Sequence, residues 1–174
     1  MSAATPAPEA QAEKPERFLD RSHITKFERF GYVAGAVLLG SLWLPWFSTS
    51  SNPNSKITTA GIGPNDSANA WEVFGKLLPW MFVLLAIAPA ILTWIVARGH
   101  KLEWPPGEVT MVAGLAGAVL VLCNGIILGK PDPAIEVSLG IGWFIALLAC
   151  ICIMVAGFQR QAMRATVKKP PGVI

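Results

Sequence analysis

Four long apolar stretches, almost free of charged residues, dominate this sequence. Hydrophobic residues make up 53% of the 174 residues and charged residues only 14%, whereas soluble domains carry about 25% charged residues. The charges gather in the polar segments that flank the stretches. A bilayer core about 30 Å thick needs roughly 20 apolar residues in helical form. The pattern therefore predicts an all-α integral membrane protein.

The four stretches predict an antiparallel four-helix transmembrane bundle. Residues 1–15, rich in Ala, Pro and Glu, predict a disordered tail, and 16–29 predict either a short amphipathic helix at the membrane surface or an extended linker. Pro89, near the middle of the second span, predicts a kink that serves packing or a hinge. The expected divisions are a tail at 1–29, a transmembrane domain at 30–158 with spans at about 30–47, 73–96, 109–128 and 135–158, an outer loop at 48–72, and a basic tail at 159–174.

The positive residues predict the orientation of the bundle. Eleven of the 14 Lys and Arg residues flank one set of span ends, and three lie at the other: Lys56, Lys76 and Lys130. Positive residues favour the cytoplasm, so both termini are expected on the cytoplasmic side of a plasma membrane. Because these charges lie beside the spans and form no basic face, no nucleic-acid partner is expected.

Ionisable side chains are absent from the central part of every predicted span. Proton-coupled transport needs such a group within the bilayer, so the sequence argues against a self-contained proton-driven exporter. The two histidines, His23 and His100, fall at the predicted cytoplasmic surface. They either meet there as metal ligands or are unrelated, and the lack of a completing Cys or acidic cluster favours the second reading.

The three cysteines, Cys123, Cys150 and Cys152, lie inside apolar stretches. Reduced thiols packed as small hydrophobic groups are expected there, because the one-residue spacing of Cys150 and Cys152 points their side chains about 200° apart on a helix. No catalytic residue, metal or cofactor is expected, and the chain is not expected to be an enzyme.

Small and polar residues within the spans predict how the helices pack. Asn124, the most polar residue deep in a span, is interpreted as an interhelical hydrogen-bond donor worth about 1 kcal/mol, with a pore-lining role as the alternative. Glycines permit close approach of neighbouring helices, and the expected packing positions are Gly31, Gly35, Gly40, Gly114 and Gly117.

Tryptophans gather at the outer ends of the spans. Their ordinary role is an interfacial belt, and the sharper hypothesis is a platform for a partner subunit or a lipid headgroup. The predicted contact residues are Trp43, Trp46, Trp71 and Trp143.

Two short motifs carry a resemblance. The segment Leu42-Trp-Leu-Pro-Trp-Phe47, the segment Ser67-Ala-Asn-Ala-Trp-Glu72 and a Gly-rich fourth span together resemble uncharacterised small four-span membrane proteins common in actinobacteria. The resemblance covers about residues 30–158 and implies a bacterial plasma membrane, with no known activity. The family's usual Ser-Ala-Trp-Glu pattern appears here with Asn69 and Ala70 before the Trp.

Three classes of function remain open. The leading hypothesis is a non-catalytic accessory or scaffold subunit that packs against a larger membrane assembly. Besides the lipid bilayer, the expected partner is another membrane protein or a second copy of this chain. The alternative is a small homo-oligomeric transporter or channel, with Pro89 as hinge and Asn124 near the path. A membrane enzyme ranks third, and it would require a ligand or metal in a pocket lined by His23, His100 or Glu103.

Overall fold

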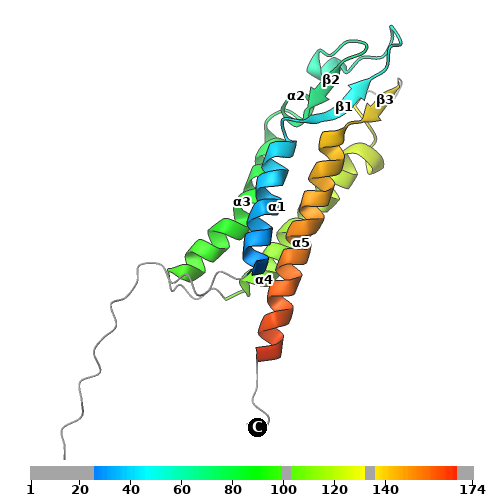
Figure 1. The fold of residues 1–174 in the computed structure, drawn as a ribbon. Coiled ribbons are helices and arrows are strands. Elements are labelled where there is room, and N and C mark those ends of the chain that lie inside the picture. The colour runs from blue at the N-terminus through cyan, green and yellow to red at the C-terminus, as the bar shows by residue number, and fades with distance from the viewer. Residues whose placement is uncertain (1–25, 99–102, 132–135, 168–174) are drawn as a thin grey trace, which may run out of the picture.

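The computed structural model describes residues 26–98, 103–131 and 136–167, with the backbone alone for 164–167. The described chain is mostly helical (Figure 1). Three expected segments lie wholly or partly outside these residues: residues 1–25 of the tail predicted at 1–29, with His23; the connection at 99–102, with His100; and residues 168–174 of the basic tail. In order, the elements are α1 (Lys26–Ser41), β1 (Pro45–Thr49), the 3₁₀ turn η2 (Thr58–Ala60), β2 (Ser67–Asn69), α2 (Ala70–Val73), α3 (Leu77–Ala97), α4 (Pro106–Leu122), the π-helical segment η3 (Cys123–Ile127), β3 (Val137–Leu139) and α5 (Ile141–Val167).

Four helices lie alongside one another, with a small sheet at one end (Figure 1). We call the end that carries the sheet the sheet end and the opposite end the far end. The most extensive helix interface joins α4 and α5, and α1 lies against both α5 and α3. Toward the far end α3 diverges from the other helices (Figure 1). Pro89 lies within this helix, where a kink was predicted.

Three helices are long and apolar enough to cross a membrane: Leu77–Ala97, Pro106–Ile127 and Ile141–Met163. They coincide with the second, third and fourth predicted spans and suit a multi-pass membrane protein. The remaining helix, α1, has 16 residues and is about 24 Å long, so it is shorter than these three.

The first predicted span ends earlier than expected, at Ser41 instead of Phe47. Proline has no N–H, so Pro45 cannot donate to the carbonyl of Ser41 four residues before it. That carbonyl accepts instead from the N–H of Leu44 at 3.2 Å and from the indole of Trp46 at 2.8 Å, and the chain continues as strand β1. The proline therefore ends the helix, and the aromatic residues that follow it belong to a sheet.

The predicted loop 48–72 contains part of a three-stranded antiparallel sheet of order β2-β1-β3. The central strand pairs Phe47 with Ala68 on one side and with Leu139 on the other. Since β3 occupies residues 137–139, the start of the fourth predicted span at 135 is also corrected, and α5 begins at Ile141. At its other end α5 runs past the predicted limit of Phe158 to Val167.

Candidate functional site

Two of the four predicted contact tryptophans, Trp46 and Trp143, are core residues. Their side chains are 0% and 2% exposed, so neither forms a surface for a partner or a lipid. The ring of Trp46 lies 5.5 Å from those of Phe74 and Phe82. Burial of these large side chains joins α1, β1 and α3 at the sheet end, which corrects the expectation from sequence.

Trp143 fills a break in the preceding helix. In η3 the backbone of Asn124 and Gly125 leaves helical geometry, and Gly125 has φ of 158°. The indole N–H of Trp143 lies 3.1 Å from the carbonyls of Val121 and Asn124. A Cβ on Gly125 would lie 2.5 Å from the indole nitrogen, so only glycine fits beside this ring. The indole N–H thus donates to two backbone carbonyls beside the break in the helix.

Asn124 is correspondingly reassigned. Its side-chain amide donates to the carbonyl of Leu120 on its own helix, at 2.8 Å, rather than across an interface as predicted. The interhelical hydrogen bond at this position runs from Trp143 to the backbone carbonyl of Asn124. An amide four residues beyond a carbonyl can compete for it locally, and sequence spacing alone did not distinguish the two arrangements.

An aromatic row joins Trp43, the half-buried Trp71 and Trp80. Trp71 lies between the other two, with ring centroids 5.7 Å from Trp43 and 5.8 Å from Trp80. It also packs against the core, whereas Trp43 is 63% exposed and Trp80 is 56% exposed. The row therefore offers two exposed tryptophans at the sheet end, of which Trp80 was not singled out as a contact residue.

Backbone pairing between the two sequence motifs holds this row in place. Pro45 pairs with Asn69 across β1 and β2, and the N–H of Ala70 donates to the carbonyl of Leu42 at 3.2 Å. Asn69 then caps α2, because its side chain accepts from the N–H groups of Trp71 and Glu72. The carboxylate of Glu72 returns to the N–H of Asn69, which completes a capping box.

The outward face of α3 extends the aromatic row along the helix. Only 22% of its most apolar window is buried, against 39% for the third span and 44% for the fourth. Apolar residues on this face recur at intervals of three and four, the spacing of a helix-packing seam. They are Leu77, Trp80, Leu84, Ile87, Ile91 and Trp94, and all except the half-buried Ile87 are exposed.

Three of the five predicted packing glycines make close interhelical contacts. A Cβ on Gly35 would overlap the carbonyl of Ala86, one on Gly114 would overlap the backbone of Met154, and one on Gly117 would lie 2.7 Å from the Cys150 sulfur. Gly31 makes looser contact, at 3.5 Å from Ala156. Gly40 faces open space with nothing within 4 Å, so its predicted packing role within the chain is wrong.

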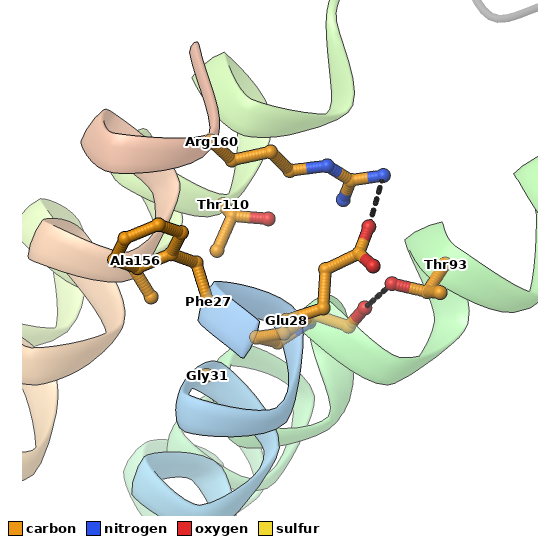
Figure 2. Close-up of a pocket in the computed structure, with 8 residues that line it drawn as sticks. Phe27, Glu28, Gly31, Thr93, Thr110, Ala156 and Arg160 are labelled. Carbon is orange, nitrogen blue, oxygen red and sulfur yellow. Dashed lines mark hydrogen bonds and ion pairs between the residues drawn. The ribbon is translucent and has the colours of Figure 1, made fainter. Parts of the chain in front are cut away.

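A polar cluster at the far end was not predicted. Arg160 of α5 and Glu28 of α1 form an ion pair of 2.7 Å, with side chains only 7% and 3% exposed. Figure 2 shows the guanidinium reaching across to the carboxylate, with Thr93 and Thr110 close by. Nearby, Gln161 of α5 donates to Glu108 of α4 at 2.7 Å.

Both members of the ion pair had been assigned to polar tails by their charge. Helical spacing carried the missing signal: Glu28, Gly31 and Gly35 lie three and four residues apart and share one face of α1. Arg160 was counted among the charges of the cytoplasmic tail, but helices enclose its side chain. Charge alone therefore gave the wrong environment for both residues.

The ion pair borders a small pocket between α1, α3, α4 and α5 (Figure 2). The cavity volume is about 10 Å³, roughly enough for one water molecule. Ligand pockets usually measure about 300–1,000 Å³. The hydroxyls of Thr93 and Thr110 beside it donate to carbonyls of their own helices, those of Pro89 and Pro106.

Among the described residues, no group of three or more His, Cys, Asp or Glu side chains is placed to hold a metal ion. The three cysteines are free thiols, and Cys150 packs against Gly117 in the interface between α4 and α5. The predicted histidine pair lies outside the described chain.

Comparison with models of known protein families, with curated proteins and with solved structures finds no match. The resemblance to small four-span proteins stays a prediction from the two motifs.

Proposed function

We propose that this chain is a plasma-membrane protein with four spans and a non-catalytic accessory or scaffold role, in which the outward face of α3 binds a helix of a partner membrane protein. The resemblance to actinobacterial four-span proteins agrees with the membrane but adds no activity. The proposed partner contact begins at the aromatic row and continues down α3. The packed interior serves to hold that face in a defined shape.

In this proposal α1, the first helix along the chain, also spans the membrane and completes the set of four. It lies against α3 and α5, both of which are long and apolar enough to cross a bilayer, so it shares their depth. Its length of about 24 Å is extended by the turn and strand that follow Ser41. Lys26, Arg29 and Arg98 lie at the far end, which supports a cytoplasmic far end and both termini on that side.

The observation that carries the proposal is the low burial of α3. Of the most apolar stretch of α3, 22% is buried, against 39% and 44% for the other two spans. Yet its large side chains recur every three or four residues, the spacing by which helices pack against one another. An exposed tryptophan lies near each end of this face, Trp80 near the start of α3 and Trp94 near its end. Aromatic side chains are enriched where proteins bind one another.

Site-specific photo-crosslinking in native membranes tests the proposal. A photoreactive residue at Leu84, on the α3 face, is expected to yield a discrete crosslinked protein. The matched control is Leu148 on α5, since both side chains are 62% exposed on apolar helices. The control should react with lipid alone.

Each outcome of the crosslinking is informative. A crosslinked product at Leu84 whose mass is not a multiple of the mass of this chain supports a partner subunit. Mass spectrometry of the product then identifies that partner. Lipid adducts alone at both positions would contradict the proposal. A product at twice the chain's mass would indicate self-association and favour the rival function.

The rival is a homo-oligomeric transporter or channel. One observation favours it: the broken helix at Asn124 and Gly125 has the irregular backbone common at transport sites. Flux into liposomes that contain the purified chain, compared with its Asn124→Leu variant, tests this idea. A flux no higher than that of empty liposomes would exclude it.

A further inference from the structure

The two ends of α1 are held by different kinds of contact. Toward the sheet end α1 buries Leu38 and Ser41, and just beyond the helix the large apolar side chains of Leu42 and Trp46 are fully buried. Toward the far end the buried residues are small or charged: Glu28, Gly31 and Ala34. Apolar burial therefore secures one end of this helix much more strongly than the other.

The backbone contacts of α1 follow the same gradient. At Gly35 the neighbouring helix approaches so closely that a Cβ would overlap the carbonyl of Ala86. One turn nearer the far end, a Cβ on Gly31 would lie 3.5 Å from that of Ala156 and 3.6 Å from that of Pro89. These are ordinary contact distances, and beyond them α3 diverges (Figure 1).

The ion pair lies where the apolar contacts weaken. The carboxylate of Glu28 and the guanidinium of Arg160 join α1 to α5 at 2.7 Å, and both are enclosed. A buried ion that loses its partner is strongly unfavourable where it stands. The large apolar side chains at this end, Phe27 and Tyr32, are only half-buried. Moving the charge out into water is therefore opposed less here than it would be at the sheet end.

We propose that Glu28 and Arg160 form a latch that closes the far end of α1 over the small pocket between the helices. When the latch is broken, the far end of α1 separates from α3 and α5, which admits water to Thr93 and Thr110. The sheet end of α1 stays docked through Leu38, and the interface between α4 and α5 does not change. This device is independent of the partner proposed for α3.

Disulfide trapping in the full-length chain tests the latch. The Cβ separation of 3.5 Å between Gly31 and Ala156 falls in the range of a disulfide. We therefore combine Gly31→Cys with Ala156→Cys in a chain whose native cysteines are replaced by alanine. Mild oxidation in detergent is followed by counting free thiols with a polyethylene-glycol maleimide after denaturation. The disulfide should form readily with the latch intact.

Charge variants then separate the latch from general stability. Arg160→Glu places two carboxylates together and should slow this disulfide at least fivefold, and the exchange Glu28→Arg with Arg160→Glu should restore most of the rate. The control disulfide joins Gly117→Cys to the native Cys150 across α4 and α5, where the Cβ atoms are also 3.5 Å apart, in a chain without Cys123 and Cys152. Its rate should stay within twofold in every variant.

Two results would overturn the latch. One is an unchanged rate for the disulfide between positions 31 and 156 in Arg160→Glu. The other is an equal loss of both disulfides in Arg160→Glu that the charge exchange does not reverse, because the pair would then stabilise the whole molecule rather than one end of α1.

Discussion

The sheet end and the far end of the molecule are built from different interactions. At the sheet end, Trp46 and Trp143 are enclosed and β1 pairs on both sides with strands distant in sequence. At the far end, an enclosed ion pair joins α1 to α5, and a hydrogen bond from Gln161 to Glu108 joins α5 to α4. The comparison teaches that burial of large apolar side chains stabilises the sheet end, whereas the far end depends on a few polar contacts.

The strongest way to break the sheet end is Trp46→Ala. This side chain is 0% exposed, and removing a buried aromatic ring costs about 3–5 kcal/mol because it leaves a cavity. The matched control is Trp43→Ala, which removes a side chain that is 63% exposed and should change stability by no more than about 0.5 kcal/mol. Unfolding of the purified protein in detergent, followed by circular dichroism, measures both. Equal effects would contradict the assignment of Trp46 to the core.

A pair of glycines sharpens the comparison between enclosed and open helix faces. Gly114→Ala places a Cβ against the backbone of Met154, 2.7 Å from its Cα, and should destabilise by about 1–3 kcal/mol. Gly40→Ala meets nothing within 4 Å and should be neutral or stabilise α1 by up to about 1 kcal/mol. Thermal unfolding in the same detergent compares the two. Destabilisation by Gly40→Ala would show that this face is occupied in the folded protein.

The smallest expected effect is at the cap of α2. Asn69→Ala removes the acceptor for the N–H groups of Trp71 and Glu72, at 2.9 and 3.1 Å, and should cost about 1 kcal/mol. Because α2 positions Trp71, tryptophan fluorescence should shift along with stability. Asn54→Ala, at an exposed loop position, is the control and should leave both unchanged. Unchanged fluorescence in Asn69→Ala would mean that the cap does not position the aromatic row.

The features predicted best are those that depend on residues close together in the sequence. Three of the apolar stretches form helices of membrane-spanning length near the expected limits, because an uninterrupted apolar run and helical rise per residue are local quantities. The packing of Gly114 and Gly117 was also anticipated, since small residues permit close approach wherever a neighbouring helix lies. Trp43 is exposed, as a surface tryptophan was expected to be, whereas Trp71 is half-buried.

The errors arose where distant parts of the chain meet. The aromatic segment after Pro45 was assigned to a span, because the partners of its strand lie elsewhere: Ser48 bonds to Ser138, 90 residues away. Trp46 and Trp143 were placed at the surface because residue type cannot distinguish an interfacial ring from one enclosed by other elements. The same reason hid the pairing of Glu28 with Arg160, two charges that looked like ordinary tail residues.

By itself the sequence determined that three apolar stretches form helices of membrane-spanning length and that Gly114 and Gly117 allow close packing. These follow from hydrophobicity and from side-chain size, both of which act within a few residues. Only the tertiary structure decided which strands pair, which tryptophans are enclosed, and that Arg160 meets Glu28. Such contacts form between segments far apart in the chain, so their energies depend on three-dimensional neighbours that no local pattern specifies.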